Sequence, residues 1–165
     1  PGVKLVHVGD AGRTEGLEGA CADADALIIE ATYVSGEEEM ANRFGHLTAH
    51  QAAELAVRAG VKNLFLVHIS RRYADWQILR EARAIFPNTV VPRDLDRYRI
   101  TTEGVEKVEG GDGGLDGSIL CFCSCCIMGQ HTGTRCSASW TGLAWKKSTQ
   151  ASFTGLCVKW RTRTW

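Results

Sequence analysis

The sequence predicts an α/β fold in which helices cover a face of a sheet. Short apolar runs rich in β-branched residues alternate with stretches whose apolar residues recur at helical spacing. The expected order is strand, helix, strand, helix, helix, strand, helix, strand, which is typical of α/β domains. A chain of 165 residues, 44% apolar and 23% charged, is long enough to bury a core of ordinary composition.

Strands are expected where short apolar runs end at Gly, Pro, Asp or a similar turn residue. The first run, VKLVHV, is followed by the turn sequence GDAG, and the run ALIIEA is read as a second buried strand. A third run, NLFLVH, is read as the third strand. The pattern predicts strands at 3–8, 26–31 and 63–68, and further short strands from 90 onward, through 98–100 and 105–108.

Helices are predicted at 14–24, 36–44, 48–59 and 74–86. The stretch 48–59 has the clearest pattern, because Ala52, Leu55, Ala56 and Ala59 share one helical face and Gly60 follows. Thr14 is the expected N-cap of the first helix. Acidic residues at the start of the second helix and an arginine at its end match the helix dipole.

The chain divides into two segments that differ in net charge and composition. Residues 1–109 carry 13 Lys and Arg against 17 Asp and Glu, a net charge of −4, whereas residues 110–165 carry 6 against 2, a net charge of +4. Six of the seven cysteines also lie beyond residue 120. We therefore expect a folded domain over 1–109 and a Gly-, Cys- and Trp-rich tail over 110–165 that is irregular, either unstructured or read out of frame.

Global properties point to no particular partner. The formal net charge is zero, so the overall charge does not indicate a nucleic-acid-binding surface. No stretch approaches the roughly 18 consecutive apolar residues of a membrane span, so we expect no membrane partner. The single cysteine of the first segment fits a cytoplasmic origin, and the start at Pro1 suggests a fragment of a longer protein.

Four polar residues stand where an α/β scaffold presents functional groups. Asp10, Glu30 and His68 follow or end apolar strands, and His46 immediately precedes the helix predicted at 48–59. Taken singly, Asp10 is most simply a turn former and a lone histidine a hydrogen-bonded core residue. Glu30 follows three apolar residues and needs a partner if it is buried. Holding an imidazole in one tautomer is a common way to meet that need.

Four motifs in one order resemble the ribonuclease Z family. Residues 9–11 resemble its Gly-Asp-Thr motif, and residues 29–33 its His-Glu-Ala-Thr-aromatic motif. Residues 45–49 resemble the His-Ser-Thr motif that opens a helix, and residues 67–73 resemble Thr-His-Phe-Ser-x-Arg-Tyr. The resemblance covers residues 1 to about 109. It implies the C-terminal half of a metallo-β-lactamase αββα sandwich.

The resemblance also implies a zinc-dependent phosphodiesterase that cleaves tRNA precursors at the 3′ end. In the family two zinc ions activate a water molecule. Carried over by motif, Asp10 and His68 would be metal ligands, and His46, oriented by Glu30, would be the catalytic acid or a charge-neutralising group. The phosphate-side candidates are Thr48, Ser70 and Arg72, with a structural ion pair as an equal interpretation of Arg72. The tRNA precursor is the implied partner, and the complete protein is expected to be a homodimer.

The family's His-x-His-x-Asp-His motif is absent from the sequence. Two metal ligands are fewer than a zinc site normally requires, so we expect this chain to be inactive alone. One alternative is another metallo-β-lactamase-fold hydrolase, such as a lactonase or a β-lactamase-like enzyme. The pairing of Glu30 with His46 favours the phosphodiesterase. A second alternative is a non-catalytic interaction module with a Cys-rich, metal-binding tail.

The tail has three interpretations. A Cys-x-Cys-x-Cys-Cys cluster beginning at Cys121, with His131 and Cys136, is a possible metal site of unusual spacing. The basic, tryptophan-bearing end is a possible single-stranded nucleic-acid surface. A reading-frame slip near Gly110 accounts for the change in composition and the loss of periodicity together, and it is the interpretation we favour.

Overall fold

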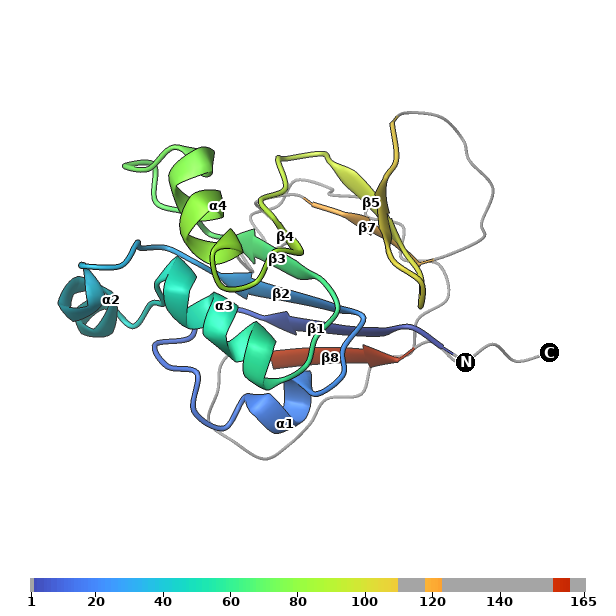
Figure 1. Ribbon diagram of the computed structural model, residues 1–165, viewed down its shortest axis with the longest axis horizontal. Helices are drawn as coiled ribbons and strands as arrows, with labels where there is room; N and C mark the ends of the chain where they lie inside the picture. Colours follow the sequence, from blue (N-terminus) through green and yellow to red (C-terminus); the bar gives the residue numbers. More distant parts are fainter. Residues whose placement is uncertain (1, 110–117, 123–155, 161–165) are drawn as a thin grey trace, which may run out of the picture.

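The computed structural model describes residues 2–109, 118–122 and 156–160. Its main sheet has five strands in the order β4-β3-β2-β1-β8 (Figure 1). Strands β1 to β4 are parallel, and β8 pairs with β1 in the antiparallel direction. The structure thus confirms the predicted α/β fold. The strands are β1 (Lys4–Val8), β2 (Ala26–Glu30), β3 (Leu64–Val67), β4 (Thr89–Val90) and β8 (Leu156–Trp160).

Helices pack on one face of this sheet. Side chains that point alternately to the two faces of the strands are buried on both, and Val6, Leu27 and Leu66 belong to the cluster on the helix side. This explains why the strands read as continuous apolar runs. The helices are α1 (Glu18–Cys21), α2 (Glu38–Phe44), α3 (Ala49–Arg58) and α4 (Asp75–Arg83).

A second, three-stranded sheet covers part of the opposite face, as Figure 1 shows. It comprises β5 (Arg97–Ile100), β6 (Val105–Lys107) and β7 (Ser118–Cys121), in the order β6-β5-β7. Its buried side chains pack on Phe65 of β3. The rings of Tyr98 and Phe122 lie 5.1 and 5.2 Å from the Phe65 ring, centroid to centroid. The architecture is therefore layered as helices, main sheet and small sheet.

The helix boundaries follow local chemistry. Helix α3 begins after Thr48, whose hydroxyl accepts a hydrogen bond from the Gln51 backbone N–H, while the Gln51 side chain accepts from the Thr48 N–H. The first helix is shorter than predicted. Thr14 does not cap it, and the Thr14 hydroxyl instead accepts a hydrogen bond from Arg58 of α3.

Strands β7 and β8 lie in the segment where the sequence predicted no regular structure. Both are defined by main-chain pairing, β7 with β5 and β8 with β1, and such pairing needs no repeating side-chain pattern. The remaining tail features, including His131, Cys136 and most of the Cys cluster, lie outside the described residues.

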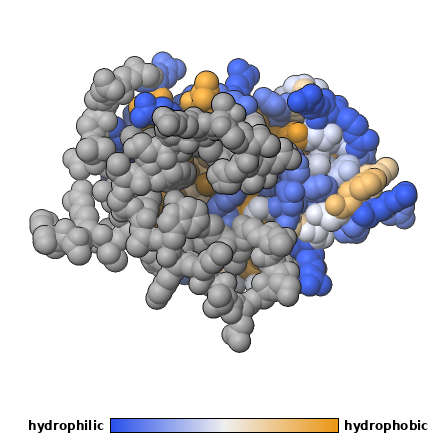
Figure 2. All heavy atoms as spheres, turned by 180° about the vertical axis from the view of Figure 1, so that it is seen from behind, coloured by the Kyte–Doolittle hydropathy of each residue, from blue (hydrophilic) through white to orange (hydrophobic). Residues whose placement is uncertain are grey.

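Exposed apolar side chains include Met40 and Phe44 of α2. Figure 2 shows apolar atoms bordered by hydrophilic ones near its right edge, the side on which α2 lies. Within the described part of the chain, every helix is too short or too polar to cross a membrane.

Candidate metal site

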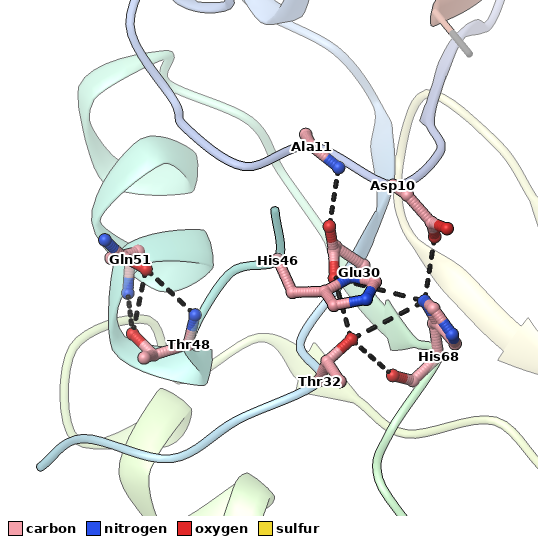
Figure 3. A network of polar contacts seen from close by, with 8 residues as sticks. All are labelled: Asp10, Ala11, Glu30, Thr32, His46, Thr48, Gln51 and His68. Atoms are coloured by element: carbon pink, nitrogen blue, oxygen red, sulfur yellow. Dashed lines mark hydrogen bonds and ion pairs between the residues drawn. The ribbon is translucent and has the colours of Figure 1, made fainter. Parts of the chain in front are cut away.

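The carboxyl ends of the parallel strands bring three of the predicted site residues to one edge of the sheet. Asp10 lies two residues beyond β1, Glu30 ends β2, and His68 directly follows β3. Strands that run in the same direction end at the same edge, so their terminal side chains meet there. His46 joins them from the connection between α2 and α3 (Figure 3). The structure thus places Asp10, Glu30, His46 and His68 together.

The main chain fixes the position of His46. Gly45 ends α2 with a left-handed backbone (φ 74°), a conformation that glycine adopts without steric cost. A β-bridge then joins Tyr33 to Thr48. Behind Gly45, the loop that follows Asp10 packs so closely that a Cβ on Gly12 would lie 3.0 Å from the Gly45 Cα. Small residues therefore allow the two loops to meet beside the site.

Glu30 is buried and fully hydrogen-bonded. Its side chain is 1% exposed. Oε1 accepts from the Ala11 backbone N–H at 2.5 Å, and Oε2 accepts from the Thr32 hydroxyl at 2.7 Å. The Nδ1 of His46 lies 2.8 Å from Oε2. Burial raises the pKa of the Glu30 carboxyl, although the hydrogen bonds from Thr32 and Ala11 and the charge of His46 oppose this rise.

The contact between Glu30 and His46 determines which imidazole nitrogen is free. An ionised Glu30 accepts a hydrogen bond, so it stabilises the tautomer of His46 that carries a proton on Nδ1. Nε2 then remains for other partners. The His46 ring lies 5.0 Å from the His68 ring, centroid to centroid, in an edge-to-face arrangement.

Thr32 is a site residue to which the sequence analysis assigned no role. Its hydroxyl lies 2.7 Å from Glu30 Oε2 and 2.9 Å from the His68 carbonyl oxygen, and its single proton can serve one of these acceptors at a time. A signal was present in the sequence. Thr32 stands two residues after Glu30 in an extended segment, and residues two apart point to the same side.

His68 has an unusual backbone. Its φ of 54° lies in the left-handed region, which is uncommon for residues other than glycine. Its Nδ1 lies 2.8 Å from the Asp10 carboxylate and 4.0 Å from Glu30 Oε2. Asp10 is 61% exposed, so this carboxylate faces solvent while that of Glu30 does not.

The donor set fits a divalent metal ion in part. Asp10, Glu30, His46 and His68 each offer a ligand atom, and these atoms all lie within 4.8 Å of one another. Imidazole nitrogen and carboxylate oxygen are ordinary ligands of zinc. Glu30, however, already uses both oxygens in hydrogen bonds. Asp10 and His68 are therefore the residues best able to hold a metal.

The three phosphate-side candidates lie in different environments. Thr48 is buried and its hydroxyl is used in the α3 cap, so it is not available to a substrate. Ser70 lies in the loop after His68, where its N–H donates to the Thr32 carbonyl. Arg72 is 53% exposed and ion-paired with Glu37.

Comparison with known proteins supports the class of fold that the sheet and the site indicate. Residues 1–69 match the family model described as the beta-lactamase superfamily domain. Together with the parallel sheet and the His/Asp/Glu cluster, this match identifies a protein of the metallo-β-lactamase fold.

Relatives narrow this class. Ribonuclease Z of Bradyrhizobium sp. (strain ORS 278) is 48% identical over 99 residues, covering 60% of this chain and 33% of that protein. Ribonuclease Z of Exiguobacterium sibiricum is 45% identical over 96 residues, covering 57% and 32%. Among solved structures, the short form of human tRNase Z is 35% identical with a TM-score of 0.40, covering 42% and 28%.

This chain is a ribonuclease Z-related protein of the metallo-β-lactamase fold. It spans about a third of the length of the curated relatives it matches.

Proposed function

We propose that Asp10, Glu30, His46 and His68 form part of the active site of a zinc-dependent phosphodiesterase that cleaves tRNA precursors endonucleolytically at their 3′ end. The observation that carries the proposal is the contact of the buried Glu30 with the part-buried His46, beside the pairing of the exposed Asp10 with His68. This arrangement supports the assignment of Glu30 and His46 to acid–base chemistry and of Asp10 and His68 to metal binding. The relatives named ribonuclease Z support the choice of substrate.

In this proposal Asp10 and His68 hold zinc. When bound, zinc supplies a water molecule of lowered pKa and stabilises charge on the phosphate. Glu30 holds His46 through Nδ1, so a protonated His46 presents its Nε2–H to the substrate. That proton passes to the 3′ oxygen that leaves as the phosphodiester bond breaks. Ser70 remains a phosphate-side candidate, because its hydroxyl stands two residues beyond His68.

We further propose that the chain is inactive without additional ligands. A catalytic zinc normally has three protein ligands, and a two-zinc site needs more than Asp10 and His68 offer. The family's His-x-His-x-Asp-His motif would supply them from a separate segment. The homodimer implied by the family resemblance remains part of this proposal.

The test combines this chain with a polypeptide that carries the N-terminal, zinc-binding segment of the Bradyrhizobium ribonuclease Z. With zinc present, we expect the mixture to cleave a tRNA precursor after the residue that precedes its 3′ trailer, and neither polypeptide to do so alone. The His46→Ala variant should lower the cleavage rate by about 10²- to 10⁴-fold, the usual contribution of acid–base catalysis. His50→Ala is the matched control, because His50 is exposed and pairs with Glu54.

A lactone substrate in the same mixture tests the alternative hydrolase. Lactone hydrolysis without tRNA cleavage would replace the phosphodiesterase proposal. If neither substrate is turned over although zinc binds, a non-catalytic role takes its place.

A further inference from the structure

The segment 33–37 lies between β2 and α2, and its first residue, Tyr33, contacts the main chain around His46 and the His46 ring. The Tyr33 N–H donates to the Leu47 carbonyl at 3.1 Å, and the Ala49 N–H donates to the Tyr33 carbonyl at 2.9 Å. The Tyr33 ring also lies 6.2 Å from the His46 ring, centroid to centroid. Tyr33 therefore supports His46 from one side, while α2 holds it from the other, where the His46 N–H donates to the Ala41 carbonyl at 2.8 Å.

Arg72 holds this segment from the loop between β3 and α4. Its guanidinium lies 5.6 Å from the Tyr33 ring centroid and 5.4 Å from that of Tyr73. It also pairs with Glu37 and donates to the Tyr73 hydroxyl at 3.0 Å. The Tyr73 hydroxyl in turn donates to Glu37 at 2.5 Å. A flat cation that contacts two rings and one carboxylate has a defined orientation, which a lysine ammonium would not provide.

Glu81 of α4 holds the same segment at a second point. Its Oε2 accepts from the Ser35 N–H at 2.9 Å, and its Oε1 accepts from the His50 N–H at 2.8 Å. His50 lies in the first turn of α3, where N–H groups lack helical partners. One carboxylate thus joins the segment 33–37 to the start of the helix that follows His46.

We propose that Arg72 and Glu81 are positioning residues that keep the His46 imidazole in its position beside Glu30 and His68. Both residues belong to the stretch of chain that follows His68. They therefore connect the segment 33–37, which contacts His46, to the part of the chain that begins with His68. The inference rests on the proposed function only for what His46 does in catalysis. It gives Arg72 a role other than direct contact with the substrate phosphate.

The experiment measures the tautomer of His46 by ¹⁵N NMR of the full 165-residue chain, free of metal and substrate. The spectra are recorded under conditions in which the ¹⁵N shifts show a neutral ring, because only the neutral imidazole has a tautomer to measure. In the wild type we expect the proton on Nδ1, facing Glu30. In Arg72→Lys and Glu81→Gln we expect most of the Nδ1–H signal to be lost. Arg58→Met, which breaks another exposed ion pair away from the segment 33–37, should leave it intact.

Each outcome decides the proposal. Unchanged Nδ1–H signals in both variants would overturn it. An unchanged signal in Arg72→Lys alone would overturn the role of Arg72 and leave its guanidinium for the phosphate. Circular dichroism of each variant identifies unfolding, and Arg72→Gln provides a second replacement if lysine disrupts the fold. Because no cleavage is measured, failure of the phosphodiesterase proposal does not affect this result.

Discussion

Replacing Glu30 with glutamine tests the hydrogen-bond network at the centre of the site. The carboxylate accepts from Ala11, Thr32 and His46, whereas an amide offers one acceptor oxygen and one donor group. If the amide NH₂ faced the Ala11 N–H, two donors would meet at 2.5 Å. The favoured arrangement therefore turns the NH₂ toward Thr32 and His46.

Both partners can adjust to that arrangement at a cost. The Thr32 hydroxyl can accept from the amide and donate to the His68 carbonyl, 2.9 Å away. His46 must then accept at Nδ1, which moves its proton to Nε2. A buried hydrogen bond that is lost or weakened costs about 1–3 kcal/mol. Relief from burying a carboxylate, whose pKa is raised, offsets part of this cost.

We therefore expect Glu30→Gln to lower the free energy of unfolding by about 1–2 kcal/mol, within the range for one buried hydrogen bond. Urea denaturation followed by circular dichroism measures this change, and ¹⁵N NMR measures the His46 tautomer. Glu54→Gln, the same substitution at a side chain that is 47% exposed, is the control. It should stay within about 0.5 kcal/mol of the wild type. A Glu30→Gln protein of unchanged stability in which His46 keeps its Nδ1 proton would refute the reasoning.

Three further predictions concern the scaffold. Thr48→Ala should cost about 1 kcal/mol by removing the α3 cap, whereas Thr48→Ser should retain most of it in the same denaturation assay. Gly12→Ala should destabilise by about 1–3 kcal/mol because its Cβ would meet the Gly45 backbone at 3.0 Å; Gly19→Ala, with nothing within 4 Å, should not be destabilising. Burial raises the pKa of Tyr98 from 10.0 to about 12, so its contribution to stability is complete below pH 10 and is lost as the pH rises through 12. Near-ultraviolet tyrosinate absorbance and alkaline unfolding should show this loss in the wild type and less of it in Tyr98→Phe, where Tyr73, whose pKa burial also raises, remains.

Local chemistry explains why much of the fold was predictable. The strands are buried on both faces, so they stand out as apolar runs, and α3 combines an apolar face with a cap and a terminal glycine. The ends of such elements also located Asp10, Glu30, His46 and His68. What local patterns could not provide was pairing between distant segments. Strand β8 joins β1 across a large sequence separation, and no periodicity marks it.

The contacts that adjust the site were also hidden from the sequence, because they depend on tertiary structure. Thr48 was a candidate for the phosphate side, yet its hydroxyl is turned into the helix cap. Arg72 had two interpretations, a phosphate contact and a structural ion pair, and in the fold it pairs with Glu37, which lies 35 positions away in the chain. The residue types in a motif indicate which hydrogen bonds and ion pairs are possible. Only the fold determines which partner each side chain contacts.

The backbone of His68 shows how the fold maintains an arrangement that is locally unfavourable. A left-handed conformation costs a residue other than glycine about 1–2 kcal/mol. It is offset here by tertiary contacts, since the His68 carbonyl accepts from Thr32 and the preceding Val67 carbonyl accepts from the Ala31 N–H at 2.9 Å. With these contacts in place the chain bends at the end of β3. The main chain leaves the strand at His68, and the imidazole lies against Asp10. Strain of this kind persists where the surrounding structure fixes it, and it concentrates at functional sites. The one strained residue among Asp10, Glu30, His46 and His68 is thus His68, which contacts both Asp10, its partner in the proposed metal-ligand pair, and Thr32 of the Glu30 hydrogen-bond network.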